Sequence, residues 1–300
     1  MIKLSVIVPC YNSAGYLEKL LSGLQKQTLT KEKMEIIIVD DGSTDQTASL
    51  LANYPFTSLF QKNKGAGAAR NLGAKKAKGE IFLFVDSDCV VSKNWAEKHL
   101  ENHEKYQDFD IIGGGVKKPK ENSLIGWADF FSSWFNAHED LKKHEVKEYL
   151  PSLNLSIKRK AFVRIGGFWQ KKMTGEDVDF CFRARKAGMK ILFDSALSVY
   201  HQSPGFLGFF KHNFNWGYHA PFLRGRKGEL TYHFLFSGHF LKSLILFWPI
   251  VFGYTLFLAS CWWRYQPLRF LISLPLIFLG KFVYGLGFLK GAWHRSFSQR

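Results

Sequence analysis

Several groups of polar residues have the types and spacing that chemistry on a phosphorylated substrate requires. The first is the pair Asp86 and Asp88, separated by a serine and placed after an apolar run. Two carboxylates so spaced can hold a hard divalent cation that also binds diphosphate oxygens. Acidic turns are common, so this pair taken alone indicates no more than a solvated turn.

Two further groups suit a nucleotide. Residues 39–45 read Val-Asp-Asp-Gly-Ser-Thr-Asp, and the carboxylates of Asp40 and Asp41 can accept a base N–H or a ribose hydroxyl. Residues 63–71 read Asn-Lys-Gly-Ala-Gly-Ala-Ala-Arg-Asn, which places glycines and Arg70 at the opening of a predicted helix. Backbone N–H groups and a guanidinium there suit a phosphate. A turn and a helix cap would explain either stretch taken alone.

A third carboxylate group lies later in the chain, where Glu176 and Asp177 open a predicted helix. One of these carboxylates can act as the general base that deprotonates an attacking hydroxyl. The helix dipole stabilises acidic residues at a helix start whatever their use, so the structural explanation stays open. His201 ends a later predicted strand, and a neutral imidazole there can complete a metal shell or simply pack.

These groups need a scaffold that brings them together. Apolar patterning predicts strands at residues 4–8, 35–39, 57–60 and 80–85, and helices at 14–27, 44–53 and 67–78. Such strand–helix–strand units form a mostly parallel sheet covered on both faces, which is an α/β fold. Because ligands bind at the carboxyl ends of parallel strands, residues 9–12, 40–43 and 86–88 are expected to meet at one edge.

The end of the chain has a different composition. The net charge of the 300 residues is +16, and residues 231–300 contain Lys and Arg but no Asp or Glu. Residues 244–263 carry no charge, and at 1.5 Å per residue they are long enough for a hydrocarbon core of about 30 Å. Residues 269–290 form a second candidate span, with Lys281 near its middle, where it can snorkel or pull the segment to the interface. Two buried helices of a soluble protein are the alternative.

We therefore predict a catalytic domain at residues 1–230 and a C-terminal membrane anchor at residues 231–300, with helices at 241–263 and 269–290. The short link between these helices predicts an antiparallel hairpin with both flanks on one side. Those flanks carry basic residues: Arg224, Arg226, Lys227, Lys242, Lys290, Arg295 and Arg300. Positive-inside bias then puts the catalytic domain on the cytoplasmic face of the cell membrane. A basic, apolar tail suits membrane lipid, so no nucleic-acid partner is expected.

Other features bear on the compartment and on the middle of the chain. The start of the chain lacks the length of apolar sequence and the cleavage site of a signal peptide, and the scattered cysteines indicate a reducing compartment. Residues 122–137 carry aromatic side chains at helical spacing, which predicts a helix facing the core, lipid or an acceptor. The charged stretch 138–148 is expected to be a mobile loop.

Taken together, these motifs resemble the family-2 glycosyltransferases of the GT-A fold, the nucleotide-diphospho-sugar transferase fold with a Rossmann-like sheet. The resemblance runs in order over about two-thirds of the chain. Its motifs are residues 4–12 (LSVIVPCYN), 35–45 (EIIIVDDGSTD), 63–88 (NKGAGAARNLGAKKAKGEIFLFVDSD), 154–168 (NLSIKRKAFVRIGGF) and 175–183 (GEDVDFCFR), followed by His201.

The resemblance implies a role for each matching residue. Pro9, Tyr11, Asp40 and Asp41 would line the base and ribose of the donor, Arg70 would approach the donor, and Asp88, Asp86 and His201 would hold Mn²⁺ or Mg²⁺ on its diphosphate. Asp177 would be the catalytic base, with Glu176 beside it. Such enzymes are hexosyltransferases that invert the anomeric centre in one displacement.

The sequence departs from processive members of the family, because the Gln-x-x-Arg-Trp motif is absent and residues 212–219 read HNFNWGYH. We therefore expect transfer of one sugar from a UDP-, GDP- or dTDP-sugar to a hydroxyl of a lipid-linked or cell-envelope glycan. A polyprenyl-phosphate sugar transferase is an alternative, because the tail resembles the hairpin of those enzymes. An inactive membrane-bound sugar-nucleotide-binding protein and a nucleotidyltransferase are the others.

Overall fold

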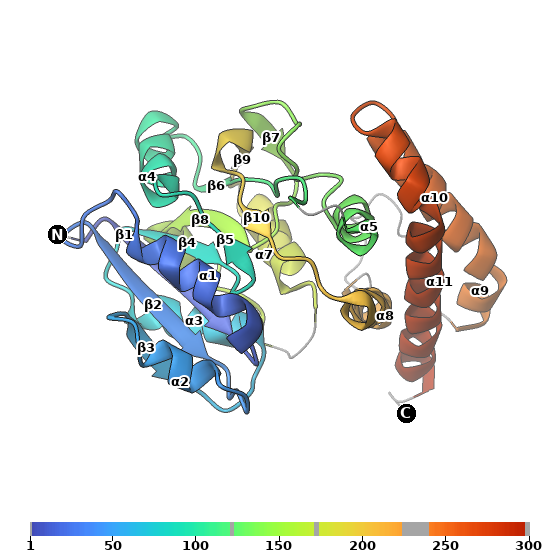
Figure 1. The fold of residues 1–300 in the computed structure, drawn as a ribbon, viewed down its shortest axis with the longest axis horizontal. Coiled ribbons are helices and arrows are strands. Elements are labelled where there is room, and N and C mark those ends of the chain that lie inside the picture. Colours follow the sequence, from blue (N-terminus) through green and yellow to red (C-terminus); the bar gives the residue numbers. More distant parts are fainter. Residues whose placement is uncertain (1, 121–122, 171–173, 224–239, 298–300) are drawn as a thin grey trace. The chain divides into compact units, whose positions relative to one another are not determined.

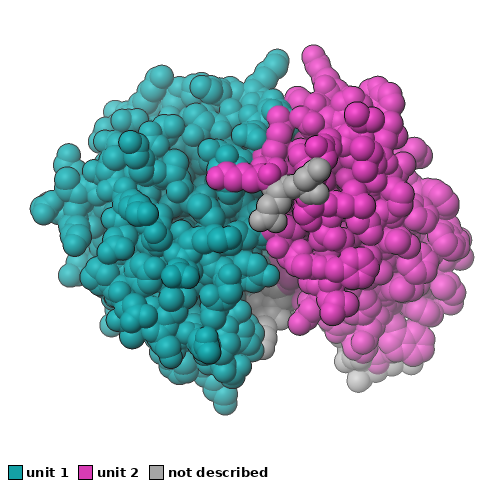
Figure 2. Space-filling model, in the orientation of Figure 1, with its two compact units in different colours: residues 1–117, 136–172, 176–202 teal, residues 118–135, 173–175, 203–300 magenta. Residues whose placement is uncertain are grey.

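The computed structural model describes residues 2–120, 123–170, 174–223 and 240–297. The chain forms two compact units (Figures 1 and 2). Unit 1 comprises residues 1–117, 136–172 and 176–202, and unit 2 comprises residues 118–135, 173–175 and 203–300. The basic flank at Arg224–Lys227 and the terminal Arg300 lie outside the described residues.

Unit 1 is built on a mixed sheet with the strand order β3-β2-β1-β4-β8-β6-β9-β7. Its strands are β1 (Leu4–Cys10), β2 (Met34–Asp40), β3 (Thr57–Phe60), β4 (Ile81–Val85), β6 (Ile111–Gly113), β7 (Glu145–Lys147), β8 (Asn154–Lys158) and β9 (Ile191–Phe193). The β1 strand pairs in parallel with β2 and β4, and β8 is antiparallel to β4 and β6. The predicted α/β fold with a mostly parallel sheet is confirmed.

The helices of unit 1 cover this sheet. They are α1 (Ala14–Gln25), α2 (Thr47–Leu51), α3 (Ala66–Lys76), α4 (Trp95–Lys105), α6 (Arg159–Arg164) and α7 (Glu176–Lys186). Every residue of β1 is buried, as expected for a central strand covered on both faces. The charged stretch 138–148, expected to be a mobile loop, instead contains β7, which pairs with β9.

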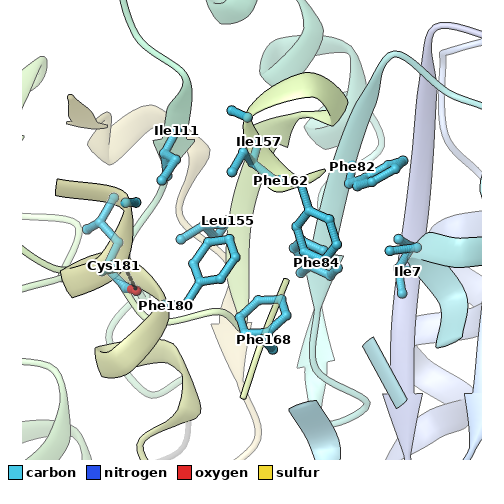
Figure 3. Close-up of a cluster of buried hydrophobic side chains, with 14 of the residues drawn as sticks. Ile7, Phe82, Phe84, Ile111, Leu155, Ile157, Phe162, Phe168, Phe180 and Cys181 are labelled. Atoms are coloured by element: carbon cyan, nitrogen blue, oxygen red, sulfur yellow. Dashed lines mark hydrogen bonds between the residues drawn. The ribbon is translucent and has the colours of Figure 1, made fainter. Parts of the chain in front are cut away.

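An aromatic cluster forms part of the core of unit 1 (Figure 3). The Phe168 ring stacks on Phe180 of α7 with their centroids 4.2 Å apart, and it meets Phe84 of β4 edge-on at 5.0 Å. The preceding Gly166 and Gly167 have φ angles of 74° and 69°, which L side chains rarely adopt. This turn therefore delivers Phe168 to the cluster.

A buried polar network lies between α4 and β8. His99 Nδ1 and His103 Nε2 each lie 2.9 Å from Ser156 Oγ, and His99 Nε2 lies 3.1 Å from Asn154 Oδ1. Burial lowers the pKa of His99 to about 4 and that of His103 to about 3. Both imidazoles are therefore neutral in the folded protein at pH 7.

This network predicts acid lability. Below pH 6.5 the unfolded chain protonates both histidines, whereas the folded protein resists protonation down to about pH 4 and pH 3. The contribution of the two histidines to the free energy of unfolding is therefore fully present above pH 6.5. By pH 4 it falls by about 3 kcal/mol for each histidine, on the order of 6 kcal/mol together. Urea unfolding from pH 7.5 to pH 4 measures this loss. The variant His103→Gln should flatten the pH dependence, and an unchanged slope would contradict the assignment.

Unit 2 is helical. Its helices are α5 (Leu124–Ser133), α8 (Phe206–Leu223), α9 (Phe240–Ile245), α10 (Phe247–Trp262) and α11 (Pro267–Phe297). Among the described residues, α11 alone is long and apolar enough to cross a membrane by length and composition, whereas α10 has 16 residues. The uncharged segment 244–263 is divided at Leu246. Pro249 lacks an N–H and its ring clashes with the carbonyl four residues earlier, which accounts for the break.

The aromatic stripe of residues 122–137 becomes α5, which packs on the tail helices of its own unit. The Trp262 ring lies 5.0 Å from Phe130 and 4.9 Å from Phe131, and its Nε1 donates to the Phe131 carbonyl at 2.9 Å. Phe131 also contacts Phe270 at 5.4 Å. The stripe therefore forms the core of unit 2.

Lys281 is buried inside unit 2 and does not snorkel. Its Nζ donates to Asn213 Oδ1 at 3.3 Å and to the Ser132 carbonyl at 3.5 Å, and it lies 4.6 Å from the Tyr254 ring centroid. A carbonyl, an amide oxygen and an aromatic ring therefore surround the ammonium group, which accounts for its burial. Close contact between α8 and α11 encloses it, since a Cβ on Gly217 or Gly287 would overlap the facing helix backbone.

Candidate active site

The carboxyl ends of β1, β2 and β4 form one edge of the sheet, and the predicted polar stretches meet there. Cys10 of β1 pairs with Asp40 of β2, while the pairing of β1 with β4 stops at Ile7, two residues before Pro9. Tyr11, the residue after the end of β1, is half-exposed. The Ser13 and Ser87 hydroxyls are 2.9 Å apart, so the turn after β1 is tied to the turn after β4.

Asp40 and Asp41 are both buried and both hold the loops around them. Asp40 Oδ1 accepts the Ser43 N–H at 2.9 Å. Asp41 accepts from Gln61 Nε2 at 2.7 Å and from the backbone N–H groups of Lys64 and Gly65 at 2.8 and 2.7 Å. Asp41 therefore fixes the glycine-rich loop that opens α3, a second use for a residue predicted to face a nucleotide.

Arg70 of α3 links two carboxylate groups that lie far apart in the sequence. Its Nη2 donates to Asp86 Oδ1 at 2.6 Å and its Nη1 to Glu176 Oε1 at 2.7 Å, while the guanidinium lies 5.3 Å from the Phe168 centroid. The side chain is 2% exposed. Burial by itself lowers the pKa of Arg70, but the two carboxylates more than offset this and raise it above its ordinary value. Arg70 thus bridges the two acidic motifs.

Asp88 and His201 come together through a small sheet of two strands. Strand β5 (Cys89–Val90) pairs antiparallel with β10 (Tyr200–His201), which sets His201 opposite Cys89. His201 Nε2 lies 3.3 Å from Asp88 Oδ2. Two ligand atoms that each lie about 2.1 Å from one cation, with a right angle between the two bonds, are about 3 Å apart. The spacing of Asp88 and His201 therefore fits a divalent ion.

The protein offers few ligands for a cation at this place. Asp86 is turned toward Arg70, and burial raises its pKa against the opposing effect of that guanidinium. In the described part of the chain, His, Cys, Asp and Glu form no group of three or more arranged to hold a metal. A cation at Asp88 and His201 would therefore need ligands from a substrate or from water.

Asp177 occupies the first turn of α7, next to Glu176. Its Oδ2 accepts the Tyr149 hydroxyl at 2.9 Å, and its Oδ1 accepts the Val178 N–H at 2.8 Å. Burial and then the Glu176 carboxylate raise the pKa of Asp177 from 3.8 to about 7, against the opposing effects of Tyr149 and Arg70. A carboxylate with a pKa near neutrality is suited to take a proton at neutral pH.

Comparison with known proteins places the chain in a family. A sequence profile of the family described as Glycosyl transferase family 2 matches residues 5–170, more than half of the chain. The chain belongs to glycosyl transferase family 2. This member of family 2 is 29% identical over 197 residues to Glycosyltransferase AglE of Haloferax volcanii, a match covering 63% of each protein. It is 43% identical over 99 residues to the poly(ribitol-phosphate) β-N-acetylglucosaminyltransferase TarS of Staphylococcus aureus, covering 31% of this chain and 17% of TarS.

Solved structures show the same fold. The mannosyltransferase PcManGT of Pyrobaculum calidifontis, in complex with GDP-Man and Mn²⁺, superposes with a TM-score of 0.63 at 17% identity, covering 99% of this chain and 88% of that one. S. aureus TarS 1–349 gives a TM-score of 0.56 at 19% identity, covering 98% and 92%. The family-2 transferase therefore has the predicted GT-A fold, and the chain spans less than two-thirds of the AglE and TarS sequences that it matches.

Sequence reasoning missed two residues of the site in this family-2 transferase. Tyr149 bonds to Asp177 from within a stretch that resembles no motif, and Phe168 supports Arg70. Phe168 ends the stretch 154–168, which resembles a family motif, but the sequence did not indicate that its ring lies against Arg70. Tyr149 carries no sequence signal, because its contact with α7 depends on how the segment after β7 packs in the folded chain.

Proposed function

We propose that this chain is a metal-dependent, inverting glycosyltransferase that moves one sugar from a nucleotide-diphosphate sugar to a hydroxyl of a lipid-linked or cell-envelope glycan. The observation that carries the proposal is the arrangement around Arg70. Its guanidinium bonds to Asp86 and to Glu176. Asp88, two residues after Asp86, lies beside His201, and Asp177, next to Glu176, has a pKa near neutrality. A candidate cation site and a candidate base therefore belong to one connected group.

The donor would occupy the carboxyl edge of the sheet. Pro9, Tyr11, Asp40 and Asp41 would surround the base and ribose, with one aspartate accepting a base N–H. Asp88 and His201, with Asp86 assisting, would hold Mn²⁺ or Mg²⁺. When bound, the cation offsets the negative charge that develops on the leaving nucleoside diphosphate. Solved structures of PcManGT with GDP-Man and Mn²⁺ and of TarS with UDP-GlcNAc support a nucleotide sugar as donor without deciding its base.

The transfer needs a base when the acceptor is a hydroxyl. Asp177 would remove the proton from the acceptor O–H as that oxygen bonds to the anomeric carbon. The bond from that carbon to the diphosphate oxygen breaks with its electron pair, so the configuration inverts in one displacement. Glu176 would remain paired with Arg70, which holds the start of α7 beside the donor site.

The tail would attach the enzyme to the cytoplasmic face of the cell membrane. The apolar length of α11 and the exposed apolar residues of α9–α11 support lipid contact. The division into a catalytic domain at 1–230 and an anchor at 231–300 stays part of this proposal. Helices α5 and α8, which fall in the proposed catalytic domain, share a compact unit with the tail.

The proposal is tested in membranes that contain the full chain. Membranes are supplied with UDP-, GDP- and dTDP-sugars and Mn²⁺, and release of the nucleoside diphosphate is measured. We expect turnover with one class of nucleotide, loss of at least about tenfold with EDTA, and recovery with added Mn²⁺ or Mg²⁺. Membranes carrying Asp88→Asn are the matched control. No metal-dependent release from any donor would overturn the proposal, and pyrophosphate release from a nucleoside triphosphate would indicate a nucleotidyltransferase.

A further inference from the structure

The segment 145–150 is fastened to the helix that carries the candidate base. Strand β7 pairs with β9, and Leu150 is fully buried. One face of α7, made by residues spaced four apart, meets the end of this segment. Asp177 Oδ2 accepts the Tyr149 hydroxyl at 2.9 Å, Cys181 Sγ donates to the Leu150 carbonyl at 3.4 Å, and Arg185 Nη2 donates to Glu148 Oε1 at 3.4 Å.

From this geometry we infer that Tyr149 is a positioning residue for the reaction, whose hydroxyl orients the Asp177 carboxylate and keeps it ionised for proton transfer. The inference rests on the proposed function, in which Asp177 is the base. The Val178 N–H binds Oδ1 and the Tyr149 hydroxyl binds Oδ2, so the plane of the carboxylate is fixed at both oxygens. Each oxygen keeps a lone pair for an acceptor hydroxyl.

The groups facing Asp177 explain why its carboxylate needs a hydrogen-bond donor. Burial and Glu176 disfavour its charged form, whereas Arg70, the Val178 N–H and the Tyr149 hydroxyl favour it. Cys181, the titratable group one turn later on the same face, is neutral because burial raises the pKa of its thiol to about 12. Burial and the Asp177 charge also raise the pKa of Tyr149, so its hydroxyl stays protonated and remains a donor.

The test is the variant Tyr149→Phe, which removes one oxygen and keeps the ring. In membranes supplied with the most active nucleotide sugar of the panel, the acidic limb of the kcat profile should move up by about one pH unit. The rate should fall about five- to tenfold at pH 7 and recover to within about twofold at pH 9.5. The midpoint of this limb does not depend on how much of the protein is folded.

A second readout does not need activity. In the detergent-solubilised full chain labelled with carbon-13 aspartate, the Asp177 carboxyl signal is identified by its loss in Asp177→Asn, and its titration midpoint should rise in Tyr149→Phe. Tyr106→Phe is the matched control, because its hydroxyl lies 3.0 Å from His144 Nε2 and away from Asp177, and it should shift neither midpoint. Unshifted midpoints in Tyr149→Phe would overturn the inference and leave the proposed function standing. Full activity of Asp177→Asn would instead overturn the base assignment.

Discussion

The variant Asp177→Asn should lower kcat for transfer to a hydroxyl by about a thousandfold, because a general base contributes about 10²- to 10⁴-fold. Asparagine keeps the shape of the side chain, and its amide oxygen can still accept the Val178 N–H. Donor binding should be unchanged to within about twofold, since the proposed donor site lies at Asp40, Asp41 and Asp88. Nucleoside diphosphate release at saturating and limiting donor separates these two effects.

The matched control is Asp179→Asn on the same helix. It makes the same change of charge, and Asp179 pairs with Arg183 of the same helix at 2.8 Å. We expect it to lower stability and to leave kcat within about threefold at a temperature well below unfolding. If Asp177→Asn kept full activity, the acceptor would need no base. An ionised phosphate acceptor, as in a polyprenyl-phosphate sugar transferase, would then fit better.

The second large effect is expected at Arg70. Replacing it with Met leaves Glu176, which is 13% exposed, and Asp86, which is 34% exposed, without their shared cation. Because water reaches Asp86, the cost in unfolding free energy should be at most about 3–5 kcal/mol. We also expect kcat/KM to fall by at least about a hundredfold, because Asp86 and the start of α7 lose their common support. Urea unfolding and donor turnover measure the two effects. Arg70→Lys should recover little, because an ammonium lacks the planar fork that reaches both carboxylates.

A double variant tests whether the unpaired carboxylates cause the loss of stability in Arg70→Met. In Arg70→Met with Glu176→Gln, one of the two unpaired carboxylates is removed, so part of the lost stability should return while the activity stays low. Arg164→Met is the control, because that exposed guanidinium bonds only to the Ala187 carbonyl among the contacts described. If the double variant were no more stable than Arg70→Met, the unpaired charges would not be the cause of the loss.

Much of unit 1 was predictable because its signals are local. Apolar runs ending at residues 8, 39 and 85 identified the strands, and parallel pairing then required the three polar turns to share an edge. The order β2-β1-β4 confirms that expectation. The tail was predictable as apolar and basic, but its helix bounds were not. A window of hydropathy cannot register the local break at Pro249, so 244–263 was predicted as continuous where α9 and α10 are separate.

The environment of the site residues was less predictable. Composition favoured a core-facing helix for the aromatic stripe of α5 and left lipid and an acceptor as alternatives, since all three favour an apolar face. Contacts of Trp262 and Phe270 with Phe131 put that stripe in the core of unit 2. Lys281 was expected to disturb a membrane span, but Asn213 and Ser132 satisfy it inside the unit.

The sequence by itself determined the family, the α/β fold and which acidic motifs are candidates for chemistry, because strand periodicity and turn residues act over a few positions. Only the tertiary structure decided what each carboxylate is bonded to. Arg70 joins residues 86 and 176, β5 and β10 join Asp88 to His201, and β7 brings Tyr149 to Asp177. Those contacts span long stretches of chain and depend on strand order, and burial at those places sets the pKa values of Asp177 and Tyr149.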